Sequence, residues 1–161
     1  MFSSLVDMSS RTRFSWSRFA KASPSIAAEI RALFEHYGQG FGYLATVRMD
    51  GGPRVHPVSP VITEGGLYLF VLASPKRRDL ERDGRYALHA YPAENSNDEA
   101  YVAGRARPVR DSRRRDRVAL AHRALPGVDW RLFELDIDVA MVTHREGDNA
   151  EAEHRIWNAP P

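Results

Sequence analysis

Residues 54–80, RVHPVSPVITEGGLYLFVLASPKRRDL, decide the expected fold of this 161-residue chain. The stretch predicts a strand at 54–62, a Glu-Gly-Gly turn, an apolar strand at 67–73 and a short helix at 75–83. Two prolines interrupt the first strand and cannot donate to a β-ladder, so we expect that strand at a sheet edge or a bulge. This order places an apolar sheet surface beside the beginning of a helix.

The beginning of that helix is a potential anion site. Backbone N–H groups at a helix N-terminus have no intrahelical partner, and the helix dipole adds positive charge there. Ser74 adds a hydroxyl, Lys76 and Arg77 add cationic groups, and Arg54 can arrive from the preceding strand. Lys76 draws notice because Lys21 is the only other lysine in the chain. A flat aromatic ligand that carries a phosphate suits such a site.

Each of these side chains also has an ordinary interpretation. Ser74 can be a plain N-cap and Lys76 a surface lysine. Arg77 and Arg78 are adjacent on the helix, so only one of them can point into the site. Alternation along the first strand puts His56 on the same face as Arg54, where it is either a structural histidine or a ligand contact.

The flanking sequence predicts more strands and few helices. We expect helices at 24–37, where Ser23 is the N-cap, and at 112–124. Further strands are expected at 41–49, 85–91, 100–109 and 133–141, with a last short strand at 154–157. An Asp-Gly pair predicts a hairpin turn after the first of these, and Gly104 predicts a close backbone approach within its strand. Six or so strands in hairpin order predict a mainly β fold, an antiparallel barrel with peripheral helices.

Composition sets the remaining limits. The length suits one domain, which we place at 23–161, after an N-terminal arm at 1–22 whose aromatic side chains pack on the body. The chain has no cysteine, which excludes disulfides, thiol nucleophiles and zinc–thiolate sites. No apolar run approaches the ~20 residues that span a bilayer, and no export signal is visible, so we expect a cytoplasmic protein with no membrane partner.

Other charged groups favour ordinary roles. The net charge is only +2, and the run RDSRRRDR at 110–117 mixes both signs at the opening of a helix. We interpret that run as a solvated face and predict no nucleic-acid partner. The histidines show no metal-ligand spacing, so no metal site is predicted. Asp136 and Asp138 alternate with apolar residues, which predicts an outward polar strand face and not an acid–base pair.

Three short motifs in order carry a family resemblance: ATVRMDGGPRVHPV at 45–58, S-x-K-x-x-x-L at 74–80 and GRARPV at 104–109. Together they resemble the pyridoxamine 5′-phosphate oxidase-like family of FMN-binding split barrels, roughly over residues 26–142. The resemblance implies a six-stranded split barrel and a homodimer that holds FMN between its protomers. It implies these cofactor contacts: Arg54, Ser74, Lys76 and Arg77 on the phosphate; Pro57, Val58, Ser59, Phe70 and Val71 along the ring; and Trp157 from the other protomer. His56, which strand alternation places on the face of Arg54, is a further candidate contact on the flavin or substrate side.

The chain also departs from the vitamin B6 oxidases of that family. Ser59 stands where those enzymes have a lysine, and the ending WNAPP lacks their Arg- and His-containing signature. The resemblance therefore implies an FMN-dependent oxidoreductase with a small-molecule substrate that is not a true pyridoxamine-phosphate oxidase. No catalytic side chain is predicted, because a flavin performs the hydride chemistry itself. The alternative is a non-catalytic module that binds a flavin, a deazaflavin or haem.

Overall fold

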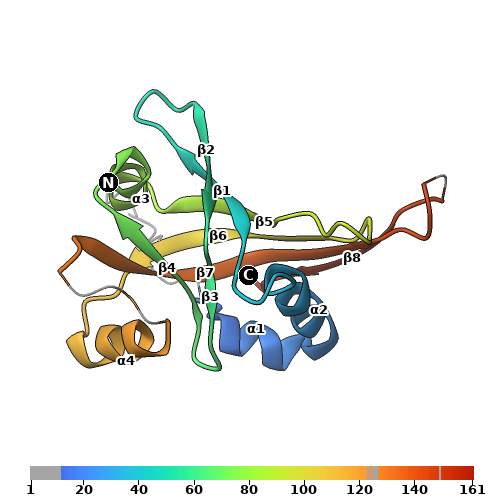
Figure 1. Ribbon diagram of the computed structural model, residues 1–161, viewed down its shortest axis with the longest axis horizontal. Helices are drawn as coiled ribbons and strands as arrows, with labels where there is room; N and C mark the ends of the chain where they lie inside the picture. Colours follow the sequence, from blue (N-terminus) through green and yellow to red (C-terminus); the bar gives the residue numbers. More distant parts are fainter. Residues whose placement is uncertain (1–11, 123, 125–126, 149) are drawn as a thin grey trace, which may run out of the picture.

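A computed structural model describes residues 12–122, 124, 127–148 and 150–161 (Figure 1). The elements are α1 (Trp16–Ala22), α2 (Pro24–Phe34), β1 (Gly42–Val47), β2 (Pro53–Val58), β3 (Val61–Ile62), β4 (Leu67–Leu72), α3 (Pro75–Arg82), β5 (Arg85–Ala90), β6 (Glu99–Pro108), α4 (Ser112–His122), β7 (Trp130–His144) and β8 (Glu153–Asn158). The described strands form one antiparallel sheet in the order β2-β1-β5-β6-β7-β4-β3, with β8 beside β7. This sheet curls into a half-barrel with helices around it, which confirms the predicted mainly β, split-barrel fold.

The sheet has eight described strands, more than the six predicted. The strand expected at 54–62 breaks after Val58, and Ser59-Pro60 separates β2 from β3. These two strands then lie at opposite ends of the strand order, β2 beside β1 and β3 beside β4. The break follows from proline chemistry, since Pro60 cannot continue a ladder. The strand β8 lies at the position of the short strand expected at 154–157.

The long strand β7 connects the two halves of the sheet. It pairs with β6 along one edge, and with β4 and then β8 along the other. Its register with β6 shifts because Ala103 lies opposite Val139, whereas Gly104 lies opposite Ile137. Asp138 is therefore the extra residue of a β-bulge. Beyond the bulge the buried face changes parity, and the prediction of one unbroken alternation over 133–141 is wrong.

Close packing at Gly104 is confirmed. A Cβ added there would lie 2.1 Å from the backbone oxygen of Asp136 and 3.0 Å from the backbone nitrogen of Asp138. Neither backbone atom can move away without breaking the β6–β7 ladder. Gly104 is thus required by space.

The predicted outward polar face on β7 is wrong at Asp136. Only 6% of Asp136 is exposed, and its carboxylate lies 2.5 Å from the Arg107 guanidinium. Burial raises the pKa of Asp136, although the hydrogen bond from Arg107 opposes that rise. Glu134 is buried on the same strand and pairs with Arg114 at 2.6 Å. The outer face of β7 therefore carries buried ion pairs instead of solvated carboxylates.

The helices cover both faces of the sheet. On the core face, α1 buries Trp16 and Phe19 and α2 buries Ile30 and Phe34. The expected packing of the arm is confirmed for α1, while residues 1–11 lie outside the described part. On the outer face, α4 covers a second cluster over β4 and β7. None of the described helices has the length and apolar character that a membrane span requires.

We expect Gly104→Ala to lower the free energy of unfolding by about 1–3 kcal/mol, because the new methyl group would strike backbone atoms. Urea denaturation measures the loss. The matched control is Gly65→Ala, where the nearest atom to a new Cβ is 3.7 Å away. The control should shift stability by less than about 1 kcal/mol. Equal losses in both variants would contradict the account of the close approach.

Candidate functional site

The helix α3 begins where sequence reasoning expected it. It follows β4 and contacts both β4 and β1 (Figure 1). Ser74 is its N-cap, and its Oγ accepts a hydrogen bond from the Arg77 backbone N–H at 3.4 Å. The same hydroxyl donates to the Leu72 carbonyl at 2.8 Å. Ser74 therefore caps the helix here, and it would have to leave Leu72 to donate to a ligand.

The buried carboxylate of Asp79, on α3, faces the strands β1 and β2. Asp79 Oδ2 accepts from Thr46 Oγ1 at 2.8 Å and from Arg54 Nε at 2.7 Å. Arg82 reaches Oδ1 at 3.4 Å. Burial opposes the charge of Asp79, but the bonds from Arg54, Thr46 and Arg82 outweigh it and lower the pKa of Asp79. We call Arg54, His56, Lys76 and Asp79, together with the capped end of α3, the α3 corner.

The two cations of the α3 corner keep free hydrogen-bonding capacity. Arg54 uses Nε on Asp79, and no bond to its terminal nitrogens is found among the described residues. Its side chain is 30% exposed, so those nitrogens can reach a ligand. Lys76 is half-buried and pairs with no carboxylate in the described part of the chain. Both groups suit a phosphate oxygen.

His56 supplies an unusual third group. It lies two residues after Arg54 on β2, so both side chains are on the same face of the strand. Its partner on β1 is Leu44. Its Nε2 is buried and has no hydrogen-bond partner among the described residues. Burial lowers the pKa of His56, and the charges of Lys76 and Arg54 lower it further. A buried ring nitrogen without a partner is costly unless a ligand satisfies it.

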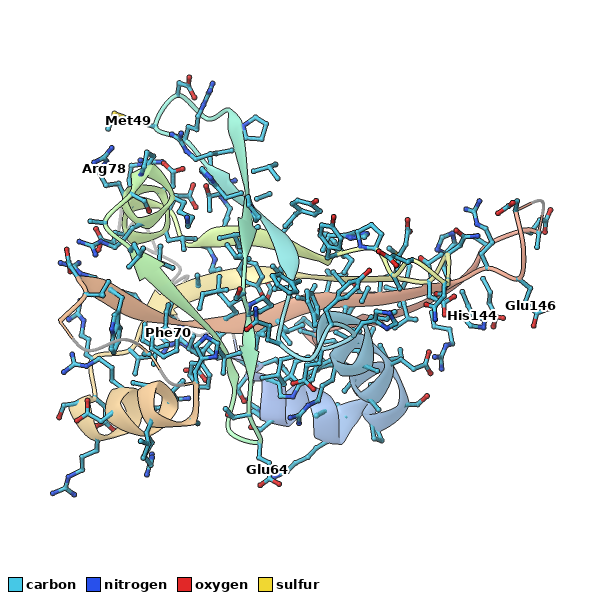
Figure 2. The ribbon with its side chains drawn as sticks, in the orientation of Figure 1. Met49, Glu64, Phe70, Arg78, His144 and Glu146 are labelled. Carbon is cyan, nitrogen blue, oxygen red and sulfur yellow. The ribbon has the colours of Figure 1, made fainter. Side chains whose placement is uncertain are left out.

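The adjacent arginines of α3 point elsewhere. Arg77 pairs with Asp129 at 3.2 Å, outside the α3 corner. Arg78 is exposed and projects from the outer side of α3 (Figure 2). The cationic character of the α3 corner therefore comes from Arg54 and Lys76.

The ring-side residues fall into two groups. Pro57 and Val58 lie on β2 and Ser59 directly after it, so they continue the strand that carries Arg54. The Val71 side chain, 1% exposed, belongs to the core. Phe70 lies on the opposite face of β4 (Figure 2), where its ring packs on His122 and Trp130 with centroid distances of 5.3 and 4.8 Å. The structure does not bring the Phe70 and Val71 side chains to the α3 corner.

Trp157 is also away from the corner. Its ring packs against Phe14 and Phe19, with centroid distances of 5.3 and 4.9 Å. This arrangement anchors β8 to α1 within one chain. It matches the ordinary role of an aromatic residue near a terminus.

Sequence reasoning missed Asp79 and Thr46. Asp79 is the one acidic residue among the first five of α3, three positions after Lys76. That position was the available signal, because an acid three or four residues from a cation shares its helix face. Nothing in the sequence shows that this carboxylate is buried against β1 and β2.

Comparisons with known proteins identify the family and the fold of the chain. The family model described as pyridoxamine 5′-phosphate oxidase matches residues 26–137, which confirms the predicted resemblance. No curated protein matches the chain.

Similar solved structures include a haem-binding protein from Mycobacterium smegmatis, with a TM-score of 0.60 and 22% identity over 82% of this chain. This chain spans 58% of that protein's length. HutZ, the haem storage protein of Vibrio cholerae, gives a TM-score of 0.56 and 19% identity over 81% of this chain and 92% of HutZ. The putative pyridoxamine 5′-phosphate oxidase of Listeria innocua gives 0.57 and 16%, over 82% of this chain and 98% of that protein. These likenesses show a shared fold.

The pKa of His56 tests whether the α3 corner receives an anion. We expect inorganic phosphate to raise this pKa from its lowered value, because a nearby negative charge favours the imidazolium. Phosphate binding should then tighten as the pH falls through that pKa. An NMR titration of the ring protons measures the shift, and His56→Gln assigns the signal. A pKa that phosphate leaves unchanged or lowers would contradict the anion site.

Proposed function

The chain belongs to the pyridoxamine 5′-phosphate oxidase family, and from this premise we propose that it is an FMN-binding oxidoreductase. The observation that carries the proposal is the buried Nε2 of His56 near Lys76: among the residues that the structure describes, this nitrogen has no hydrogen-bond partner and Lys76 pairs with no carboxylate. These groups fit a phosphate, which offers acceptor oxygens and negative charge together. FMN would supply the hydride chemistry, and the chain would supply binding and orientation.

In this proposal each group of the α3 corner has a distinct task. Lys76 and the terminal nitrogens of Arg54 would donate charge-assisted hydrogen bonds to the phosphate. The beginning of α3 would add its backbone N–H groups and the positive end of the helix dipole. His56 Nε2 would complete the set as a donor, in the tautomer or charge state that carries its proton there.

The flavin ring would lie along the end of β2. This strand pairs only with β1 in the described sheet, so its other edge is unpaired. Pro57 cannot donate there, but the neighbouring N–H and C=O groups can bond ring heteroatoms. Ser59 offers a further hydroxyl directly after β2.

We also propose that a second copy of the chain covers the outer sheet face. Cross-strand register aligns a row of six mainly apolar or aromatic side chains on that face: Pro57, Tyr43, His89, Tyr101, Met141 and Ile156. In the single chain Tyr43 is 38% exposed, Ile156 56% and the neighbouring Val55 61%. A contiguous apolar face of this kind marks an interaction surface. Because Pro57 belongs both to this row and to the ring-side segment, the dimer interface would border the cofactor.

The substrate would be a small molecule placed over the ring and enclosed by the partner. Ser59 and the WNAPP ending separate this chain from the vitamin B6 oxidases. A deazaflavin that carries a phosphate would use the same α3 corner.

A non-catalytic haem module is the second candidate. Two of the similar structures are haem proteins by name, and His56 offers a buried ring nitrogen without a partner, as an axial ligand requires. The cationic corner favours the phosphate ligand over haem.

The double variant Arg54→Ala/Lys76→Ala should lose FMN affinity by about a hundredfold or more, because two charge-assisted bonds disappear. Isothermal titration with FMN measures the loss. Arg78→Ala is the matched control, since Arg78 lies on the same helix but faces solvent. Unchanged affinity in the double variant would show that the phosphate assignment is wrong.

Tyr101→Glu should convert the dimer to a monomer, because it places a charge in the middle of the apolar row. Sedimentation velocity measures the change in mass. Leu120→Glu is the control, because Leu120 is 83% exposed on α4 and outside the row. Dissociation by the control, or a dimer that survives Tyr101→Glu, would move the interface elsewhere.

A further inference from the structure

We propose that Asp79 is a positioning residue whose buried carboxylate fixes the Arg54 guanidinium for the phosphate. This inference rests on the proposed function, since it concerns how the same α3 corner recognises its ligand. Asp79 is 3% exposed, so its charge is held inside the protein. It belongs to α3, whereas Arg54 comes from β2 and Thr46 from β1. One carboxylate therefore connects the three elements that build the corner.

The geometry of the pair sets which atoms remain for the ligand. Arg54 donates through Nε to Asp79 Oδ2 at 2.7 Å. A guanidinium is planar and rigid, so fixing Nε also fixes the plane of the two terminal nitrogens. Those nitrogens have no partner among the described residues, and the Arg54 side chain as a whole is 30% exposed. Asp79 thus leaves the bidentate end of Arg54 for phosphate oxygens.

Asp79 also orders Arg54 before the ligand arrives. A free arginine side chain samples many rotamers and loses that freedom on binding. The Nε–Oδ2 bond, supported by the Thr46 bond to the same oxygen at 2.8 Å, has already restricted those rotamers. Arg54 therefore loses less conformational entropy when phosphate binds.

The negative charge of Asp79 opposes phosphate binding, whereas its positioning of Arg54 favours it. A carboxylate near a phosphate repels it, and burial weakens the screening of that repulsion. Arg54 and Arg82 neutralise much of this charge locally, with contacts at 2.7 and 3.4 Å. Neutralising Asp79 should therefore tighten phosphate binding if charge dominates, and weaken it if positioning dominates. We expect positioning to dominate.

Asp79→Asn separates these effects, because it keeps the shape of the side chain and removes its charge. We expect FMN to bind about tenfold more weakly, because the bond from Arg54 to a neutral amide oxygen lacks the charge assistance of the carboxylate and holds the guanidinium less firmly. Riboflavin, which lacks the phosphate, should bind within about twofold of its wild-type affinity. General damage to the fold would weaken both ligands together, so the ratio of the two affinities is the readout.

Fluorescence titrations with FMN and with riboflavin measure both affinities. Two further variants complete the set. Glu81→Gln is the matched control, since it makes the same acid-to-amide change on α3 at a carboxylate that pairs with Arg131 outside the α3 corner. It should keep the wild-type ratio. In an Arg54→Ala background, Asp79→Asn should no longer weaken FMN binding relative to riboflavin, because the positioning acts through Arg54 and only the repulsion between Asp79 and the phosphate remains to be removed.

Each outcome decides one question. Equal or tighter FMN binding by Asp79→Asn, a parallel loss of riboflavin, or a weakening of FMN binding that persists without Arg54 overturns the positioning role. Wild-type protein that binds FMN no better than riboflavin overturns the α3 corner as a phosphate site, and with it the proposed function.

Discussion

Backbone pairing along β7 is the constraint on which the rest of the structure depends. This strand spans fifteen residues and pairs with β6 on one edge, but with two different strands on the other. Between β4 and β8 its edge is completed by single contacts. The Ile137 N–H donates to the Phe14 carbonyl at 2.7 Å, and the Ala159 N–H donates to the Asp138 carbonyl at 2.8 Å. Buried backbone groups must be paired, so the chain brings both terminal segments to this strand. The bulge at Asp138 lies at the same point and changes the buried face there. With β4 fixed on β7, the following helix α3 lies against β1, and the α3 corner forms.

The sequence predicted the parts of this arrangement that depend on neighbours along the chain. Turn residues after Met49, the Ser-Pro step before α3 and the alternation along β5 and β6 are local signals, and the structure follows them. Gly104 also predicted a close backbone contact within its strand, and the structure confirms it. Features that depend on distant partners were not visible. The bulge at Asp138 arises from its pairing with β6, and the alternation of 133–141 gives no sign of it. Nothing in the sequence distinguishes Asp136 and Asp79 from solvated acids. Only the fold shows that each is buried and paired with an arginine.

The candidate site divides in the same way. Arg54, His56 and Lys76 were predicted from strand alternation and from the beginning of a helix, and the structure brings them together. Phe70 and Val71 lie on β4, shortly before that helix. The Phe70 side chain packs against α4, and the Val71 side chain packs in the core. Trp157 remains with α1 of its own chain. The shared fold connects the chain with a putative pyridoxamine 5′-phosphate oxidase and with haem proteins alike, so the chemistry of the α3 corner has to decide between a flavin and haem. Its cations, the helix N-terminus and the His56 ring nitrogen, which has no partner in the described part of the chain, together favour a phosphate-bearing flavin.

Native mass spectrometry of the purified chain after incubation with FMN, combined with its visible absorption spectrum, tests the central claim most directly. The account predicts a complex of two chains and two FMN molecules with flavin absorption bands. Chains that retain no FMN, or a Soret band from bound haem in place of the flavin bands, would contradict it.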